Sequence, residues 1–186
     1  MTSTTDTPAA HYRDLAEKFT GRVESVPADL WNAVSPCEGW TARDLLRHVI
    51  DTQRYIVTVV DLELPADPSV DDDPVGAWAA TRDGMQHILD DPERGNREYD
   101  GHFGRTTLAE TVGSFYCFDL VVHGWDLARA TGLDETIPAD DLAWVQAVAE
   151  QLGDNIRMAG VCGPAVEVPT DADEQTRLLG FLGRKA

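Results

Sequence analysis

The chain has 186 residues, which is long enough for one domain with a sizeable hydrophobic core. Its 33 acidic and 15 basic residues give a formal net charge of -18. Binding to nucleic acid or to an anionic membrane surface requires a basic patch, so this charge argues against both classes of partner.

The sequence also lacks the marks of a membrane or secreted protein. No stretch approaches the roughly 20 apolar residues that span a bilayer. The polar N-terminus lacks the basic start and apolar stretch of a signal peptide. We therefore expect residues 1–8 to form a disordered lead and the protein to be cytoplasmic. Three widely spaced cysteines, Cys37, Cys117 and Cys162, favour reduced thiols over a disulfide framework.

Helical periodicity dominates the first half of the chain. Amphipathic patterns predict helices over about 9–26, 42–64 and 75–89. The second has the clearest start, because Thr41 and Asp44 match a capping box. An acidic connection that contains proline, 65–74, separates the second helix from the third.

The second half contains one break in the helical pattern. Residues 92–105 include a glycine-containing turn and predict a small hairpin. A helix is expected over 107–131, where Gly132 can terminate it. Another is expected from Pro138 to about Met158, and a short one near 174–182. The sequence thus predicts an all-α fold, an antiparallel four-helix bundle with a short additional helix and a hairpin.

A carboxylate and an imidazole stand one helical turn apart in the helix over 107–131. Asp119 and His123 share one face of that helix within a strongly apolar run. An ionised Asp in such a run is costly to bury without a partner. His48, on the inner stripe of the second helix, is the natural third ligand of a divalent metal. The alternative is a buried Asp–His pair, with His48 as a separate core residue.

Several residues near the candidate ligands have either a structural role or a role at the metal site. Asp126 and Arg129 are three residues apart and predict an ordinary pair on the helix surface. The alternative is that Asp126 orients a ligand histidine. Cys37 precedes the second helix and is expected to be a buried, inert thiol, although it can lie near the metal. Cys117 is expected in the core.

The remaining histidines and two tryptophans are assigned mainly to structural roles. We expect His87 to be half-buried in the core and His11 to be solvated. His102 lies in the predicted turn, from which it can reach the mouth of the bundle. Trp40 and Trp125 flank the two ligand segments and are expected in the core, with the pocket mouth as the alternative.

Three segments resemble a known family. Residues 36–48, PCEGWTARDLLRH, resemble the start of the metal-bearing helix of the DinB-like superfamily. Residues 119–132, DLVVHGWDLARATG, resemble the second motif of its actinobacterial branch, which is related to the mycothiol-dependent maleylpyruvate isomerase N-terminal domain. Residues 177–184, RLLGFLGR, are similar to the C-terminal signature of that branch.

The resemblance covers nearly the whole chain and implies one DinB-like metal-binding domain over residues 1–186. It implies a divalent metal, zinc before nickel or iron, held by His48, Asp119 and His123. Relatives use mycothiol, bacillithiol or glutathione, and the metal favours the thiolate form of the bound thiol. The resemblance therefore implies a transferase or isomerase in which such a thiol attacks a small electrophilic substrate.

This sequence differs from the isomerase relatives in two respects. Asp119 stands where the isomerase relatives tend to have Glu, and its shorter side chain can shift the ion. The chain is also too short for the separate C-terminal domain that supplies catalytic residues in the isomerase. The alternatives are a metal-hydroxide hydrolase, non-haem iron chemistry and a non-enzymatic homodimer that binds a metal or ligand.

Overall fold

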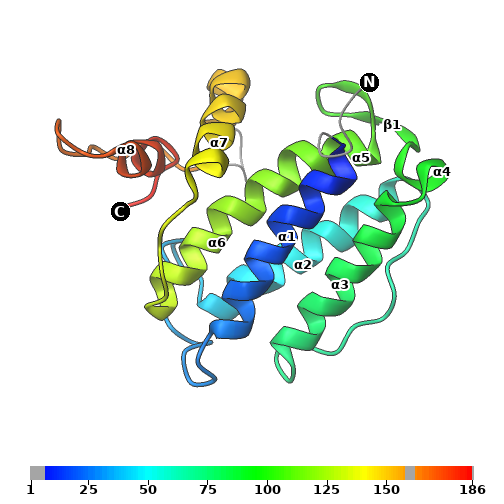
Figure 1. The fold of residues 1–186 in the computed structure, drawn as a ribbon, viewed down its shortest axis with the longest axis horizontal. Coiled ribbons are helices and arrows are strands. Elements are labelled where there is room, and N and C mark those ends of the chain that lie inside the picture. The colour runs from blue at the N-terminus through cyan, green and yellow to red at the C-terminus, as the bar shows by residue number, and fades with distance from the viewer. Residues whose placement is uncertain (1–6, 158–161, 186) are drawn as a thin grey trace.

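The computed structural model describes residues 7–157 and 162–185, and it confirms the predicted all-α bundle (Figure 1). The bundle consists of the helices α1 (Pro8–Ser25), α2 (Ala42–Val59), α3 (Pro74–Leu89) and α6 (Cys117–Thr131). Shorter elements follow α3, namely α4 (Pro92–Gly95), β1 (Glu98–Gly101), β2 (Gly104–Thr107) and α5 (Leu108–Thr111). The C-terminal part adds α7 (Ala139–Leu152) and α8 (Glu174–Phe181) beside the bundle (Figure 1).

Each bundle helix packs against two others. Helices α1 and α2 both contact α3 and α6. Helices α1 and α6 run in one direction, whereas α2 and α3 run in the opposite direction (Figure 1). The connection 60–73 produces this arrangement, because it runs back along the bundle and starts α3 at the same end as α2 (Figure 1).

Local sequence signals explain where the bundle helices begin and end. Thr7 caps α1 by accepting a hydrogen bond from the backbone N–H of Ala10. The predicted capping box of Thr41 and Asp44 is present at the start of α2. Gly132 terminates α6 as predicted, with a φ of 71° in the left-handed region that favours glycine.

Two helices differ from the predicted ranges. Helix α2 ends at Val59 instead of near residue 64, because Asp61 adopts a φ of 54° that cannot continue a right-handed helix. The predicted helix over 107–131 is interrupted. Helix α5 is followed by the π-helix η1 (Val112–Tyr116), and α6 begins only after it.

Two other predictions fall partly outside the described residues. Helix α7 ends at Leu152 and a short 3₁₀ segment, η2 (Gly153–Arg157), follows it. The predicted end of this helix at Met158 lies outside the described residues. The same is true of residues 1–6 of the predicted lead, while α1 already begins at Pro8.

The predicted hairpin is present. Strands β1 and β2 pair in antiparallel register, with Gly101 opposite Gly104. His102 and Phe103 form the two-residue turn between them. Gly104 has a φ of 108°, which residues with a side chain rarely adopt, and this glycine allows the turn to close.

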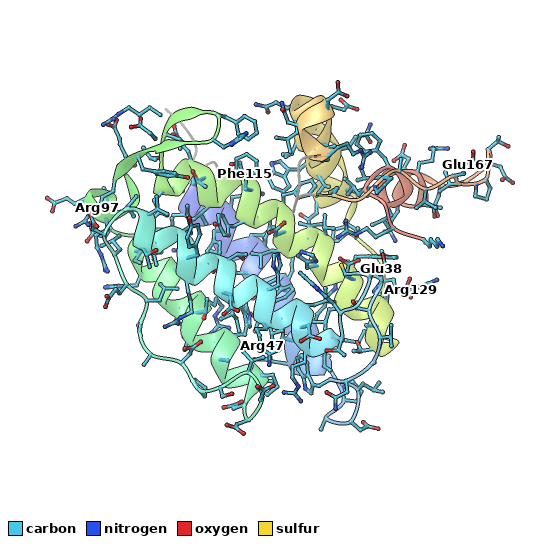
Figure 2. The ribbon with its side chains drawn as sticks, turned by 180° about the vertical axis from the view of Figure 1, so that it is seen from behind. Glu38, Arg47, Arg97, Phe115, Arg129 and Glu167 are labelled. Atoms are coloured by element: carbon cyan, nitrogen blue, oxygen red, sulfur yellow. The ribbon has the colours of Figure 1, made fainter. Side chains whose placement is uncertain are left out.

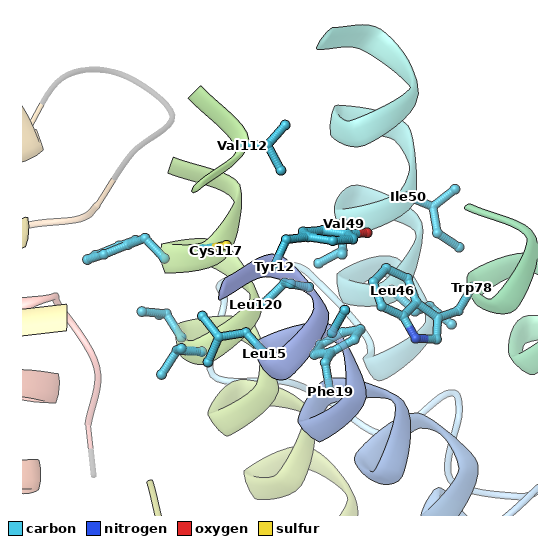
Figure 3. Packing of buried hydrophobic residues seen from close by; sticks show 14 of the residues in the cluster. Tyr12, Leu15, Phe19, Leu46, Val49, Ile50, Trp78, Val112, Cys117 and Leu120 are labelled. Atoms are coloured by element: carbon cyan, nitrogen blue, oxygen red, sulfur yellow. The ribbon is translucent and has the colours of Figure 1, made fainter. Parts of the chain in front are cut away.

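The hydrophobic core fills the space between the four bundle helices (Figure 3). Buried side chains from all four helices meet there, including Leu15, Leu46, Trp78 and Leu120. Cys117 is also buried in this core, as predicted. Within residues 7–157 and 162–185, no helix is long and apolar enough to cross a membrane.

Candidate metal centre

The three predicted ligands come together between α2 and α6, which lie side by side (Figure 2). His48 projects from α2, and Asp119 and His123 project from consecutive turns of α6. One donor atom from each lies within 4.8 Å of the other two. The Nε2 atom of His48 is 4.0 Å from Asp119 Oδ2, and the two imidazole centroids are 5.1 Å apart. Sequence periodicity therefore identified residues that the fold places in one cluster.

This spacing is close to what one ion requires. Two ligand atoms that share a zinc ion at bonds of 2.0–2.2 Å lie at most about 4 Å apart. The separation between His48 and Asp119 is at that limit. A small contraction of the side chains would bring all three donors to a common ion, including the short Asp119 side chain.

His123 is held in one orientation by a buried carboxylate. Its Nδ1 lies 3.0 Å from Asp126 Oδ2. An ionised carboxylate only accepts hydrogen bonds, so Nδ1 is the donor and Nε2 remains available to a metal. The Arg184 guanidinium donates to both oxygens of Asp126, at 3.3 and 2.9 Å. Arg184 thus neutralises the carboxylate that orients His123.

The prediction of a surface pair between Asp126 and Arg129 is wrong. Asp126 is fully buried, because its side chain points towards His123 and Arg184. Arg129 forms its ion pair with Glu135 instead, at 3.0 Å. The alternative reading of Asp126 as the partner of a ligand histidine is the one that the geometry supports.

A second group of potential ligands shares His123. Cys37, His123 and Asp126 also offer donor atoms within 4.8 Å of one another. The Cys37 Sγ lies 3.5 Å from Asp126 Oδ2 and 3.9 Å from an Arg184 nitrogen. Because Asp126 is already paired with Arg184 and His123, it is a poorer metal ligand than Asp119. The cluster of His48, Asp119 and His123 is therefore the better candidate for a metal site.

The two histidines have opposite pKa shifts. Burial lowers the pKa of His48, and the neighbouring His123 lowers it further. Burial would also lower the pKa of His123, but hydrogen bonds with Asp126 and Cys37 and the charge of Asp119 raise it to about 10. Without a metal, the raised pKa therefore favours a positive charge on His123. A divalent cation bound at Nε2 would take the place of that proton.

Two cavities adjoin the cluster. The larger, of about 1070 Å³, is the more polar of the two and is bordered by His48, His123 and residues from the C-terminal tail, including Arg184. The smaller, of about 590 Å³, is bordered by His48, Asp119 and aromatic side chains of the hairpin and η1. The candidate ligands thus lie where two cavities of different chemical character approach each other.

The tryptophan and cysteine predictions have mixed outcomes. Trp125 is fully buried in the core, as predicted. Trp40 is half-buried beside the cluster, with its ring centroid 4.9 Å from that of His48, so its assignment to the core is wrong. Cys37 is half-buried and its basic neighbour is Arg184, which is distant in sequence and was missed.

The other three histidines lie away from the cluster. His87 is exposed instead of half-buried, because it projects from the outer face of α3. His11 is half-buried instead of solvated, and it packs edge-to-face on Trp144 at 4.5 Å between ring centroids. His102 is exposed in the hairpin turn and borders the smaller cavity, in agreement with the prediction.

A helical bundle that carries two histidines and a carboxylate on facing helices defines a broad class of candidate metal proteins. Comparison with known proteins is more specific. The chain belongs to the mycothiol maleylpyruvate isomerase N-terminal domain family, whose pattern matches residues 12–128. This match confirms the family inferred from the sequence motifs and includes all three candidate ligands, whereas the third motif, residues 177–184, lies outside the matched range.

Individual relatives add little about function. Two uncharacterized proteins of Mycobacterium tuberculosis, from strains CDC 1551 / Oshkosh and ATCC 25618 / H37Rv, are each 27% identical to the chain. These alignments cover 94% of this chain and 96% of each relative. No solved structure matches the chain. The site itself must therefore support any more specific conclusion.

Proposed function

We propose that the protein is a divalent-metal-dependent enzyme that uses a low-molecular-weight thiol, such as mycothiol, in a transferase or isomerase reaction. The proposal depends chiefly on one observation: two imidazoles and a carboxylate from facing helices have donor atoms within 4.8 Å of one another. Membership of a mycothiol-related family supports the choice of thiol chemistry.

In this proposal some residues would bind the metal and another would orient a metal ligand. His48, Asp119 and His123 would bind the ion, for which zinc is the first expectation. Asp126 would keep the Nδ1 proton of His123 in place, so that Nε2 faces the ion. When bound, a divalent metal supplies Lewis acidity that lowers the pKa of a thiol.

The larger cavity is the better place for a hydrophilic thiol, because it is the more polar of the two. It borders His48 and His123 and contains the guanidinium of Arg184 and the indole of Trp40. A hydroxyl-rich thiol needs many hydrogen-bond partners, which polar walls provide. Its thiol proton would pass to solvent as the sulfur approaches the three-ligand cluster.

A bound thiolate could act in two kinds of reaction. In a transfer, the thiolate sulfur forms a bond to an electrophilic carbon, and the leaving group departs with the electron pair of the broken bond. In an isomerisation, the thiolate adds to an activated double bond, rotation follows, and the thiolate is expelled unchanged. Both cases require the thiolate as nucleophile and no external oxidant or reductant.

Elemental analysis of the purified full chain tests the metal assignment. We expect near-stoichiometric zinc, nickel or iron in the wild type and loss of that metal in His48→Ala and in His123→Ala. His87→Ala is the matched control, because His87 is exposed on α3 and distant from the cluster. The assignment is wrong if the wild type takes up no metal after reconstitution, or if both ligand variants retain it.

Turnover assays then separate thiol chemistry from hydrolysis. The metal-loaded protein is assayed with ester and electrophile substrates, each with and without added thiol. Consumption of the electrophile only when thiol is present supports the proposal. Ester hydrolysis without thiol would replace it with the alternative that a metal-bound hydroxide is the nucleophile.

A further inference from the structure

The smaller cavity has features of a binding site that the metal cluster alone does not explain. Its volume of about 590 Å³ lies within the range of small-molecule sites. It is bordered by α2, the β1–β2 hairpin, α5, η1 and the start of α6, and by Leu152 and Asn155. Phe115, in η1, lies near the hairpin (Figure 2). His48 and Asp119 form part of its wall.

Aromatic side chains give this cavity its character. The rings of Phe103 and Phe115 stack at 5.8 Å between centroids with an interplanar angle of 10°. Phe103 stands at the tip of the hairpin and is 57% exposed, which is unusual for a large apolar side chain. The rings of Tyr99 and Tyr116 extend the same wall. Flat apolar surfaces of this kind favour a planar apolar ligand.

Two polar groups of the wall, the Tyr99 hydroxyl and the Glu110 carboxylate, already have hydrogen-bond partners within the protein. The Tyr99 hydroxyl bonds to Thr111 at 2.7 Å. Glu110 accepts hydrogen bonds from Thr106 and Thr107 as part of the capping box of α5. These groups are therefore not free to bind the polar groups of a ligand.

The charges of the wall disfavour an anion. Glu110 and Asp119 border the cavity and are both acidic. The Arg105 guanidinium, also on the wall, is engaged by Glu98 at 2.8 Å and lies 3.7 Å from Asp100. Its charge is thus offset by neighbouring carboxylates. A dicarboxylate would meet repulsion here, whereas an uncharged molecule would not.

We propose that this cavity binds a neutral, flat, apolar molecule, such as an aromatic electrophile, and holds it against the His48–Asp119 side of the cluster. The role of this molecule as substrate rests on the proposed function, but its binding does not. The two cavities would then bind the two reactants from different sides, with the hydrophilic thiol beside His123 and the apolar body beside Phe115.

Binding of N-phenyl-1-naphthylamine, a neutral aromatic probe that fluoresces in apolar surroundings, tests the proposal on the metal-free full chain. We expect saturable binding that succinate does not displace. Loss of one stacked ring in Phe103→Ser should weaken the affinity about fivefold, the order expected for an aromatic pair. Phe115→Ser should act in the same direction, and the double variant should weaken binding further.

Phe181→Ser is the matched control. Phe181 is also an exposed phenylalanine, at 42%, but it lies on α8 outside this cavity. The control should bind the probe like the wild type. Phe103 is at an exposed hairpin tip, so its variant should remain folded even if Phe115→Ser does not. The proposal is overturned if the wild type does not bind the probe, or if Phe103→Ser binds it as well as the control does.

The metal content of the same samples separates this proposal from the proposed function. If probe binding depends on Phe103 but the protein takes up no metal, the proposed binding site is supported and the proposed metal-dependent function is wrong. Metal uptake and thiol-dependent turnover without such probe binding would overturn the cavity assignment and leave the proposed function intact.

Discussion

At the scale of single residues, the arrangement around His123 determines the chemistry of the site. Its imidazole lies between a candidate metal position on one side and the buried Asp126 carboxylate on the other. Hydrogen bonds and nearby carboxylates outweigh burial, so this ring favours the protonated state without metal. The same carboxylate raises the basicity of the ring as a ligand once the Nε2 proton has left.

Asp126→Asn tests the orienting role of this carboxylate. The amide has nearly the same shape but no charge, and it can turn its NH₂ group towards the ring. We expect the metal affinity, measured by competition with a chelator, to fall about 10- to 100-fold. Asp83→Asn, a change at an exposed carboxylate on α3, should leave the affinity unchanged. An unchanged affinity in a folded Asp126→Asn protein would contradict the orienting role.

The pH dependence of metal binding follows from the two histidines. The pKa of His48 is lowered, so this ring is already neutral, whereas the pKa of His123 is raised from 6.5 to about 10. One proton must therefore leave His123 when the metal binds. We expect the apparent affinity to rise by up to about tenfold per pH unit between pH 6 and 8. An affinity that does not change over this interval would contradict a protonated His123.

The stability of the metal-free protein should change with pH in the opposite direction to its metal affinity. Since the folded-state pKa of His123 is raised, its contribution to the free energy of unfolding is fully present below about 6.5. That contribution is lost as the pH rises through about 10. The metal-free protein should thus become less stable over the interval in which its affinity for metal increases.

At the scale of elements, the sequence predicts the three candidate ligands better than it predicts the residues that hold them in place. The residues of α2 and of α6 that face each other follow from hydrophobic periodicity, so His48, Asp119 and His123 could be identified. The partner of Asp126 could not, because Arg184 is 58 residues away and local spacing favoured Arg129 instead. Long-range ion pairs leave no periodic signal in a single sequence.

The π-helix η1 is the other feature that periodicity missed. Its residues, Val112–Tyr116, are compatible with an α-helix, and only the i→i+5 hydrogen bonding distinguishes it. One extra residue shifts the following helix by about 100° relative to an uninterrupted one. This shift separates the face of α5 from that of α6. Phe115 lies within η1 and stacks on Phe103 in the smaller cavity.

At the scale of the whole molecule, the C-terminal tail completes a site that otherwise belongs to the bundle. The family match ends at residue 128, yet Arg184 reaches back to the buried Asp126 of α6. Burial works against the positive charge of Arg184, but the Asp126 carboxylate raises its pKa above the ordinary value. The tail is therefore tied to α6, the helix that carries Asp119 and His123, by a nearly fully buried ion pair.

Arg184→Gln tests whether the tail supports the site. Removing Arg184 leaves His123 as the remaining charged partner of the buried Asp126 carboxylate. Loss of one partner of a buried ion pair destabilises proteins by about 3 kcal/mol. We expect a loss of this order in the free energy of unfolding, measured with denaturant on the metal-free chain. Lys185→Gln removes one positive charge from the next residue, which is exposed, and should have almost no effect.

The metal affinities of the same two variants test whether Arg184 also supports metal binding. If the ion pair fixes Asp126, and through it His123, Arg184→Gln should bind metal more weakly than Lys185→Gln at a pH where both are folded. Equal metal affinities with a clear difference in stability would assign Arg184 a structural role only. Equal stabilities would show that the pair contributes no net free energy, since its desolvation cost can offset the attraction between the charges.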